Sequence, residues 1–452
     1  MWRLGRNLAI GKGAITYSLT PAATYPIQRK NLPKFYFMNR SFFLSLKRAT
    51  ILFLVILAVL SSEAQSVVCT IEGSTTDRET KKLYLVESGA DIRTMDEVVS
   101  IPVVNGKFNY TWKGERQLFL QLIPDNQYAD GNIRAAYFIT ENQHVTVQMG
   151  RADADKVIVK GDGKETRMLQ RCLQEIDAVY APQMAAMDEK MDSLDQLLQH
   201  HMDSLTPSEQ EQFLAEYHSP HSNNPLIAAY RQTEQAYREL IEEENLATAK
   251  WLDAHPCMYG LFYMKDRLAI SKSQTDALTS FLIRSYQQTY SKKYRQHPYH
   301  ASIQSSLQSL TLQPGNQYID YAVSLPDGKQ AALSTLFTGE IIYIDLWASW
   351  CGPCRRHAKA LMPIYEKYKD KGFQIIGIAR ESKAEDMQKA IQKDGYPWPC
   401  LLELNDQHQI WLKNGISNSA GGGFLITKAG KILAVYPSAE ETERILLEYL
   451  GK

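Results

Sequence analysis

Two cysteines, Cys351 and Cys354, stand two residues apart where one hydrophobic pattern gives way to another. The run before them, Ile341–Leu346, is almost entirely apolar, as in a buried strand, whereas the residues from about Cys351 to Tyr368 have the spacing of an amphipathic helix. A strand that turns directly into a helix places Cys351 at the helix N-terminus, where unpaired N–H groups and the helix dipole stabilise a thiolate. The pKa of such a thiol falls from about 8.5 to within roughly 3.5–7.5.

The spacing of the two cysteines admits a redox centre, half of a zinc site or an inert disulfide. A four-ligand zinc site needs a second C-x-x-C or a Cys/His pair, and the sequence shows neither at a suitable spacing. With Gly352 and Pro353 between the cysteines, Cys354 lies one helical turn beyond Cys351 and is less exposed, so that it can attack a mixed disulfide formed by Cys351. The pattern therefore favours redox use.

Strand and helix patterns alternate through residues 312–452, which open at the turn Gln313-Pro314-Gly315. This alternation predicts an α/β domain with a mixed sheet and helices on its faces. Besides the strand and helix around the cysteines, the expected elements are strands at Phe373–Ala379, Gly423–Thr427 and Ile432–Val435, and helices at Ala384–Lys393 and Ala439–Leu450.

Two regions of different texture precede this domain, in keeping with two to four domains for 452 residues. Residues 65–163 contain short β-type segments separated by turns, with Asn105-Gly106 as a hairpin signal, and predict a small antiparallel β domain. Residues 164–311 carry apolar side chains three and four apart, with a helix start at "LTPSEQ", and predict a helical region.

Residues 1–64 are expected to be an upstream extension followed by a secretory signal peptide. Basic residues follow Met38, the expected initiator, and the apolar run Ala49–Leu60 leads to a small-x-small cleavage site ending at Ala64. Because a helix needs about 20 apolar residues to span a bilayer, an uncleaved membrane anchor is the less favoured alternative. We expect a periplasmic or otherwise extracytoplasmic protein.

Charge and the other cysteines add further expectations. With 50 basic and 50 acidic residues, the balanced chain gives no sign of binding nucleic acid. Val68 precedes Cys69 where lipidation requires a small residue, so a lipid anchor is disfavoured. Cys172 and Cys257 could pair, and Cys400 fits a buried free cysteine better than a third redox thiol. Metal binding is a minor alternative for the histidines at positions 200, 201, 218, 221, 297 and 300.

The segment "YIDLWASWCGPCR" resembles the active site of the thioredoxin superfamily. Together with "LQPGNQYIDYAVSLPDGKQAALSTLFTG" before it and "GFLITKAGKIL" after it, it resembles the TlpA/ResA-like branch of extracytoplasmic thiol:disulfide oxidoreductases. The likeness covers residues 312–452. The β-rich region is similar to a small domain of unknown function that often precedes such modules, and the helical region to the usual spacer.

The resemblance implies roles for individual residues and no cofactor. Cys351 would be the nucleophile and Cys354 the resolving thiol, whose proton Asp345 helps to take. Among apolar neighbours Asp345 would have a raised pKa, although a purely structural acid is the alternative. The residues expected to contact substrate are Trp347, Trp350, Gly352, Pro353, Ala420 and Gly421.

Three positions depart from the family pattern. Gly421, in "NSAGGGFLIT", stands where relatives place a cis-proline, and because a non-proline cis bond costs about 2.5–4 kcal/mol we expect Ala420-Gly421 to be trans. His357 and Lys359 replace the usual Glu and Pro on the active-site helix. His357 could tune a thiol pKa, but a solvent-exposed helix histidine is the favoured interpretation.

Two functions follow from these features. The first is an exported enzyme that exchanges disulfides with protein thiols, with a membrane redox partner; the resemblance favours a reductant, as in relatives that keep apocytochrome thiols reduced during cytochrome c maturation. The alternative is a partner- or ligand-binding module with little catalytic activity. A peroxidase is disfavoured because the P-x-x-x-T-x-x-C arrangement of such relatives is missing.

Overall fold

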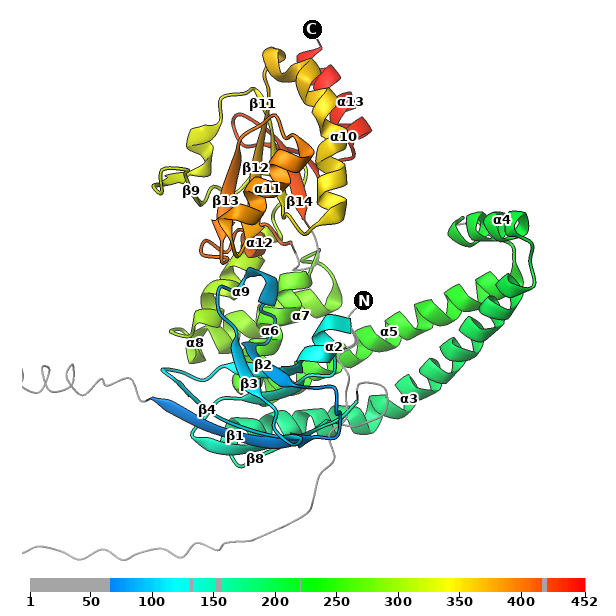
Figure 1. The fold of residues 1–452 in the computed structure, drawn as a ribbon, viewed down its shortest axis with the longest axis vertical. Helices are drawn as coiled ribbons and strands as arrows, with labels where there is room; N and C mark the ends of the chain where they lie inside the picture. Colours follow the sequence, from blue (N-terminus) through cyan, green and yellow to red (C-terminus); the bar gives the residue numbers. More distant parts are fainter. Residues whose placement is uncertain (1–65, 131–132, 152–156, 220, 417–420, 452) are drawn as a thin grey trace, which may run out of the picture.

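A computed structural model describes residues 66–130, 133–151, 157–219, 221–416 and 421–451. The expected signal peptide therefore lies outside the described residues. Figure 1 shows three parts: strands of the N-terminal region at one end, a helical region with a long projecting hairpin, and an α/β domain at the other end.

The N-terminal region forms two four-stranded sheets with a shared core. One sheet has the order β4-β1-β7-β8 and the other β3-β2-β5-β6. Their buried faces meet in one apolar cluster that includes Ile71, Leu85, Phe138 and Val147. The strands are β1 (Val67–Thr75), β2 (Lys82–Glu87), β3 (Val99–Pro102), β4 (Lys107–Gly114), β5 (Phe119–Pro124), β6 (Ala136–Ile139), β7 (Gln143–Met149) and β8 (Ile158–Gly161), with a 3-10 turn η1 (Ile92–Thr94) and a short helix α2 (Asp125–Asp130).

The expectation of a purely antiparallel domain is wrong at one pairing. β1 pairs with β4 in antiparallel fashion but with β7 in parallel, so the first sheet is mixed. The turn at Asn105-Gly106 is confirmed: both residues have positive φ, 52° and 70°, and Val104 and Lys107 exchange two backbone hydrogen bonds across it. These are the left-handed conformations that a tight two-residue turn requires.

The middle of the chain is helical, as expected, and the change from strands to helices falls between β8 and the next element. α3 (Lys164–Asp203) and α5 (Pro225–Ala254) form the projecting hairpin of Figure 1, with α4 (Pro207–His218) at its tip. Thr206 and Glu209 form a capping box at the start of α4. The remaining helices are α6 (Met258–Ile270), α7 (Ala277–Ser285), the π-helical turn η2 (Tyr286–Tyr290), α8 (Ser291–Lys293) and α9 (Pro298–Ser309).

Buried side chains join the helical region to the β domain. Leu169 and Cys172 of α3, Leu261 of α6 and Tyr299 of α9 share one cluster with Phe119 and Ile139 of the second sheet. Among the described residues, we find no helix with the length and apolar character that crossing a membrane requires.

The C-terminal domain is built on a five-stranded sheet of order β13-β12-β11-β14-β15. The central strand β11 pairs in parallel with β12 and antiparallel with β14, and all of its side chains are buried. The elements are β9 (Ala322–Ser324), β10 (Gln330–Ala332), η3 (Leu333–Leu336), β11 (Ile341–Trp347), α10 (Gly352–Tyr368), η4 (Lys369–Lys371), β12 (Phe373–Glu381), α11 (Ala384–Asp394), β13 (Cys400–Leu404), α12 (Ile410–Lys413), β14 (Gly422–Thr427), β15 (Ile432–Val435) and α13 (Ala439–Leu450).

Each face of this sheet packs into its own core. Side chains of α10, α11 and α13 join one cluster with Tyr343 and Trp347 of β11. The opposite face packs against residues that precede β11 in the sequence, such as Tyr318 and Leu333, and against Trp411 of α12. A strand buried on both faces explains the continuous apolar run of β11. The predicted α/β class is confirmed.

Candidate active site

Cys351 and Cys354 form a disulfide at the N-terminus of α10. Their Cα atoms lie 5.4 Å apart, within the usual range for such a bond. Cys351 is the N-cap residue, and its Sγ accepts a hydrogen bond from the backbone N–H of Cys354 at 3.3 Å. Cys351 is 6% exposed and Cys354 is 3% exposed. The pair therefore sits where a helix N-terminus stabilises negative charge on the first sulfur.

Asp345 lies under this helix, in the middle of β11. Because alternate residues of a strand face the same side, Asp345 shares its face with Tyr343 and Trp347, which pack in the same cluster as the two cysteines. Asp345 is 2% exposed, and burial raises the pKa of its carboxyl to about 7. Among the described residues, its Oδ2 has no hydrogen-bond partner. Asp345 is thus a buried acid that can gain or lose a proton near neutral pH.

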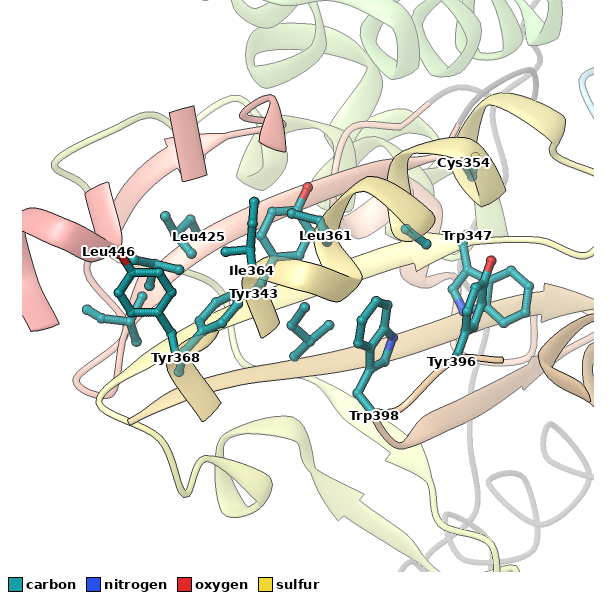
Figure 2. Packing of buried hydrophobic residues seen from close by; sticks show 14 of the residues in the cluster. Tyr343, Trp347, Cys354, Leu361, Ile364, Tyr368, Tyr396, Trp398, Leu425 and Leu446 are labelled. Carbon is teal, nitrogen blue, oxygen red and sulfur yellow. The ribbon is translucent and has the colours of Figure 1, made fainter. Parts of the chain in front are cut away.

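Trp347 was expected to contact substrate, but its side chain does not reach the surface around the disulfide. Its side chain is 0% exposed and packs edge-on against Tyr396, with ring centroids 4.9 Å apart. Figure 2 shows these two rings side by side in the core below α10. Trp347 supports the site from inside the domain, since its position on β11 turns its side chain toward the face of the sheet that α10, α11 and α13 cover.

Trp350, by contrast, is only partly buried and directly precedes Cys351. The turn that carries it is held from β12: Glu381 accepts hydrogen bonds from the backbone N–H of Ser349 at 2.5 Å and from its Oγ at 2.9 Å. Burial raises the pKa of Glu381. No sequence motif pointed to Glu381. Gly352 and Pro353, the residues between the cysteines, are exposed.

Gly421 lies against the second sulfur. A Cβ atom at this position would come within 2.4 Å of both Cys354 Sγ and the backbone oxygen of Leu346. On this backbone the close approach leaves no room for a Cβ atom, so the position requires glycine. Ala420 lies outside the described residues, as does the expectation of a trans bond before Gly421.

His357 is partly buried, so the expectation of a solvent-exposed helix histidine is wrong. Its Nε2 lies 2.9 Å from the hydroxyl of Tyr343, and its ring lies 5.3 Å from that of Tyr436. Desolvation lowers the pKa of His357. Lys359 is exposed and forms an ion pair with Asp394 at 2.9 Å, which ties α10 to the end of α11.

Comparisons with known proteins find likenesses over this domain. A family model described as Redoxin matches residues 313–450. The chain is 26% identical over 138 residues to the thiol-disulfide oxidoreductase ResA of Bacillus thuringiensis subsp. konkukian, covering 30% of this chain and 77% of that protein. ResA of Geobacillus thermodenitrificans is 24% identical over 136 residues, covering 29% and 73%. These likenesses support a TlpA/ResA-like thioredoxin-family domain at the C-terminus.

Solved structures give likenesses over the same part of the chain. The thioredoxin domain of a thiol-disulfide oxidoreductase from Bacteroides vulgatus is 25% identical, covering 31% of this chain and 99% of that one, with a TM-score of 0.28. A thiol:disulfide interchange protein from Bacteroides sp. is 24% identical, covering 31% and 93%, with a TM-score of 0.29. In this chain the thioredoxin-like domain follows the β domain and the helical region.

Four cysteines lie outside this disulfide: Cys69, Cys172, Cys257 and Cys400. Cys172 and Cys257 both lie in the core of the helical region and are not joined. In the thioredoxin-like domain, burial and, to a smaller extent, the nearby Asp345 raise the pKa of Cys400 to about 12. A thiol with this pKa is a poor nucleophile at neutral pH.

Two of the candidate histidines make structural contacts. His297 caps α9 and its Nε2 lies 2.8 Å from the carbonyl oxygen of Gln117, while His300 contacts the hydroxyl of Tyr286. Within the described ranges, no group of three or more His, Cys, Asp or Glu side chains is placed to hold a metal ion.

Proposed function

We propose that this protein is an exported thiol:disulfide oxidoreductase that reduces disulfides of protein substrates with the Cys351–Cys354 pair. The observation that carries the proposal is the position of this disulfide: at a helix N-terminus, on the face of the sheet that buries Asp345. The ResA-like relatives support the class of reaction. The signal-like segment ending at Ala64 supports export, and an exported reductant requires a membrane redox partner as its electron source.

The reaction begins from the reduced pair. The thiolate of Cys351 attacks one sulfur of a substrate disulfide, so that a mixed disulfide forms and the other substrate sulfur leaves as a thiolate that takes up a proton. Trp350, Gly352, Pro353 and the backbone at Gly421 would contact the substrate, because they surround the two sulfurs and are not buried.

Resolution then requires that Cys354 lose its proton. Asp345 is the acceptor, since a carboxylate with a pKa of about 7 can take a proton near neutrality. The thiolate of Cys354 attacks Cys351 Sγ, the mixed disulfide breaks, and the second substrate sulfur leaves as a thiolate and is protonated. The substrate gains two electrons and two protons, and the protein ends in the disulfide form that the structure shows.

The equilibrium reduction potential of the pair tests this proposal. The mature protein is equilibrated in dithiothreitol redox buffers and the thiols are counted, with Cys351→Ser as control. A potential well below about −200 mV, lost in the control, would support a reductant, and a value near −120 mV would instead indicate an oxidant. A pair that never cycles would leave the binding module as the better interpretation.

A further inference from the structure

The β domain contacts the active site of the thioredoxin-like domain through its 3-10 turn η1. The guanidinium carbon of Arg93, in this turn, lies 3.8 Å from the ring centroid of Trp350. Trp350 is the residue immediately before Cys351. A guanidinium at this distance over an indole ring is attracted to the negative face of the ring.

Arg93 is held in place by a carboxylate of its own turn. Asp91 accepts from Nε of Arg93 at 2.9 Å and from Nη2 at 2.7 Å, and it also caps the turn by accepting from the backbone N–H of Arg93 at 3.1 Å. The Asp91 side chain is 5% exposed. Such a bidentate, buried acceptor fixes the plane of the guanidinium, so the group that lies on Trp350 is oriented in advance.

The turn is itself anchored to the thioredoxin-like domain. Asp91 Oδ2 lies 3.5 Å from Nη1 of Arg380, a β12 residue whose side chain is 4% exposed. Arg380 also forms an ion pair with Asp406, with Nε and Oδ1 2.6 Å apart. Thr94 Oγ1 lies 3.0 Å from Asp406 Oδ2, a contact between residues 312 apart in the sequence. We call these contacts of Asp91, Arg93 and Thr94 the interdomain clasp.

A cavity and a small apolar cluster both adjoin the turn that carries the clasp. A cavity of about 1580 Å³ opens beside η1 between the three regions of the chain, and its lining includes Ile92, Met95, Tyr263 and Trp411. Ile92 and Met95 also pack against an apolar cluster of the β domain, so the contacts of Asp91, Arg93 and Thr94 are what join the turn to the thioredoxin-like domain. Within the described part of the chain, the buried Nε1 of Trp350 has no hydrogen-bond partner; the ring packs against the core of its own domain and receives the cation of Arg93 on one face.

The strand β12 links the clasp to the disulfide turn. Arg380 binds the clasp, and the next residue, Glu381, binds the backbone and hydroxyl of Ser349. Trp350 is thus fixed from two directions: its ring by Arg93 and the backbone before it by Glu381. The rim beside Cys351, by which we mean the ring of Trp350 and its contacts, is therefore held by residues of two domains.

We propose that Arg93 is a positioning residue for the disulfide-exchange reaction, which holds the ring of Trp350 in the orientation that receives a protein substrate beside Cys351. The inference rests on the proposed function. In this role the β domain helps to build the substrate-binding surface at Trp350. A protein substrate extends over Trp350, whereas a small disulfide reaches the sulfur of Cys351 without contacting it.

Single-turnover reduction of insulin by the pre-reduced full chain tests this role, because it needs no electron donor. Arg93→Ala is compared with wild type and with Arg116→Ala, a matched control in the same domain whose side chain is 47% exposed, against 41% for Arg93. We expect Arg93→Ala to raise the half-saturating insulin concentration about 3- to 10-fold, in line with a cation–π contact, with the limiting rate within about twofold. Arg93→Lys, which keeps the cation, should recover part of the loss.

A double-mutant cycle with Trp350→Leu separates positioning from structural damage. If Arg93 acts through Trp350, Arg93→Ala should have less than about a twofold effect in the Trp350→Leu background. An equal effect in both backgrounds, no effect in wild type, or a lower half-saturating concentration would overturn the proposal. The last result would identify the clasp as a cover over the site.

An activity-independent signal keeps this inference apart from the proposed function. In protein labelled with 5-fluorotryptophan, the ¹⁹F resonance of Trp350, assigned with Trp350→Leu, should shift in Arg93→Ala and not in Arg116→Ala. An unchanged resonance means that the contact does not form in solution, which refutes the proposal. Insulin left intact by the wild type, with the resonance shift present, would refute the reductase function and with it the substrate role of the rim.

Discussion

The raised pKa of Asp345 predicts a stability that falls with pH. The carboxyl has an ordinary pKa of 3.8 and a pKa of about 7 in the folded protein, because burial disfavours its charged form. The folded state therefore binds a proton more tightly than the unfolded state. The stabilisation that the protonated Asp345 carboxyl gives the folded state is fully present below about pH 4 and is lost as the pH rises through 7. The difference between the two pKa values corresponds to about 4 kcal/mol, at 1.36 kcal/mol for each pKa unit.

Asp345→Asn removes this titration while keeping the shape of the side chain. We expect the free energy of unfolding of the variant, relative to wild type, to rise by about 4 kcal/mol between pH 4 and pH 8. The assay is urea unfolding of the oxidised full chain, followed by tryptophan fluorescence. Trp347, Trp350, Trp398 and Trp411, four of the seven tryptophans, lie in the thioredoxin-like domain and report its transition.

The control is Asp327→Asn in the turn between β9 and β10. Hydrogen bonds from Lys329 lower the pKa of this exposed aspartate, so it stays ionised throughout the same pH window. Its difference from wild type should be flat with pH. If the Asp345→Asn difference is also flat to within about 0.5 kcal/mol, the buried carboxyl does not titrate as reasoned, and its role as proton acceptor for Cys354 loses its basis.

Three other predictions concern neighbours of the disulfide. Gly421→Ala should destabilise the thioredoxin-like domain by roughly 1–3 kcal/mol in urea unfolding, because its Cβ would collide with the backbone oxygen of Leu346. Gly352→Ala is the control and should leave the stability unchanged, because the nearest atom to its Cβ would be Arg356 Nη1 at 3.6 Å. Glu381→Gln should speed amide exchange at Ser349 about tenfold by mass spectrometry, because it weakens a charge-assisted bond; an unchanged rate would mean that Glu381 does not brace the turn. After reduction at pH 8, iodoacetamide should label Cys351 long before Cys400, whose pKa is about 12; equal labelling would contradict the burial of that thiol.

Where the signal is local, the sequence predicts the fold closely. The strand expected at Ile432–Val435 and the helix expected at Ala439–Leu450 have the observed bounds, and the strand from Ile341 is one residue longer than predicted. Three elements were missed because they are too short to show a period: β9 and β10 have three residues each and α12 has four. β13, "CLLEL", was missed directly after the prolines of "YPWPC".

For the site, too, residues with a local sequence signal were predicted and those without one were not. Cys351, Cys354 and Asp345 stand within one short segment, so a motif reveals them together. Trp347 was misplaced although strand alternation puts it on the covered face with Asp345. Nothing in the sequence near Arg93 indicates that it meets Trp350, because that contact depends on how whole domains pack.

The position of β1 in its sheet has a consequence for the order in which the chain folds. β1 is flanked by β4 and β7, and Cys69 in β1 is paired with Gln143 in β7. A chain made from its N-terminus completes the antiparallel pair β1–β4 first, and until residues 143–149 appear the other edge of β1 has no partner. An open edge of this kind can pair with a neighbouring chain. Until β7 is available, this edge of β1 can pair with another chain, and the parallel pairing with β7 removes that risk.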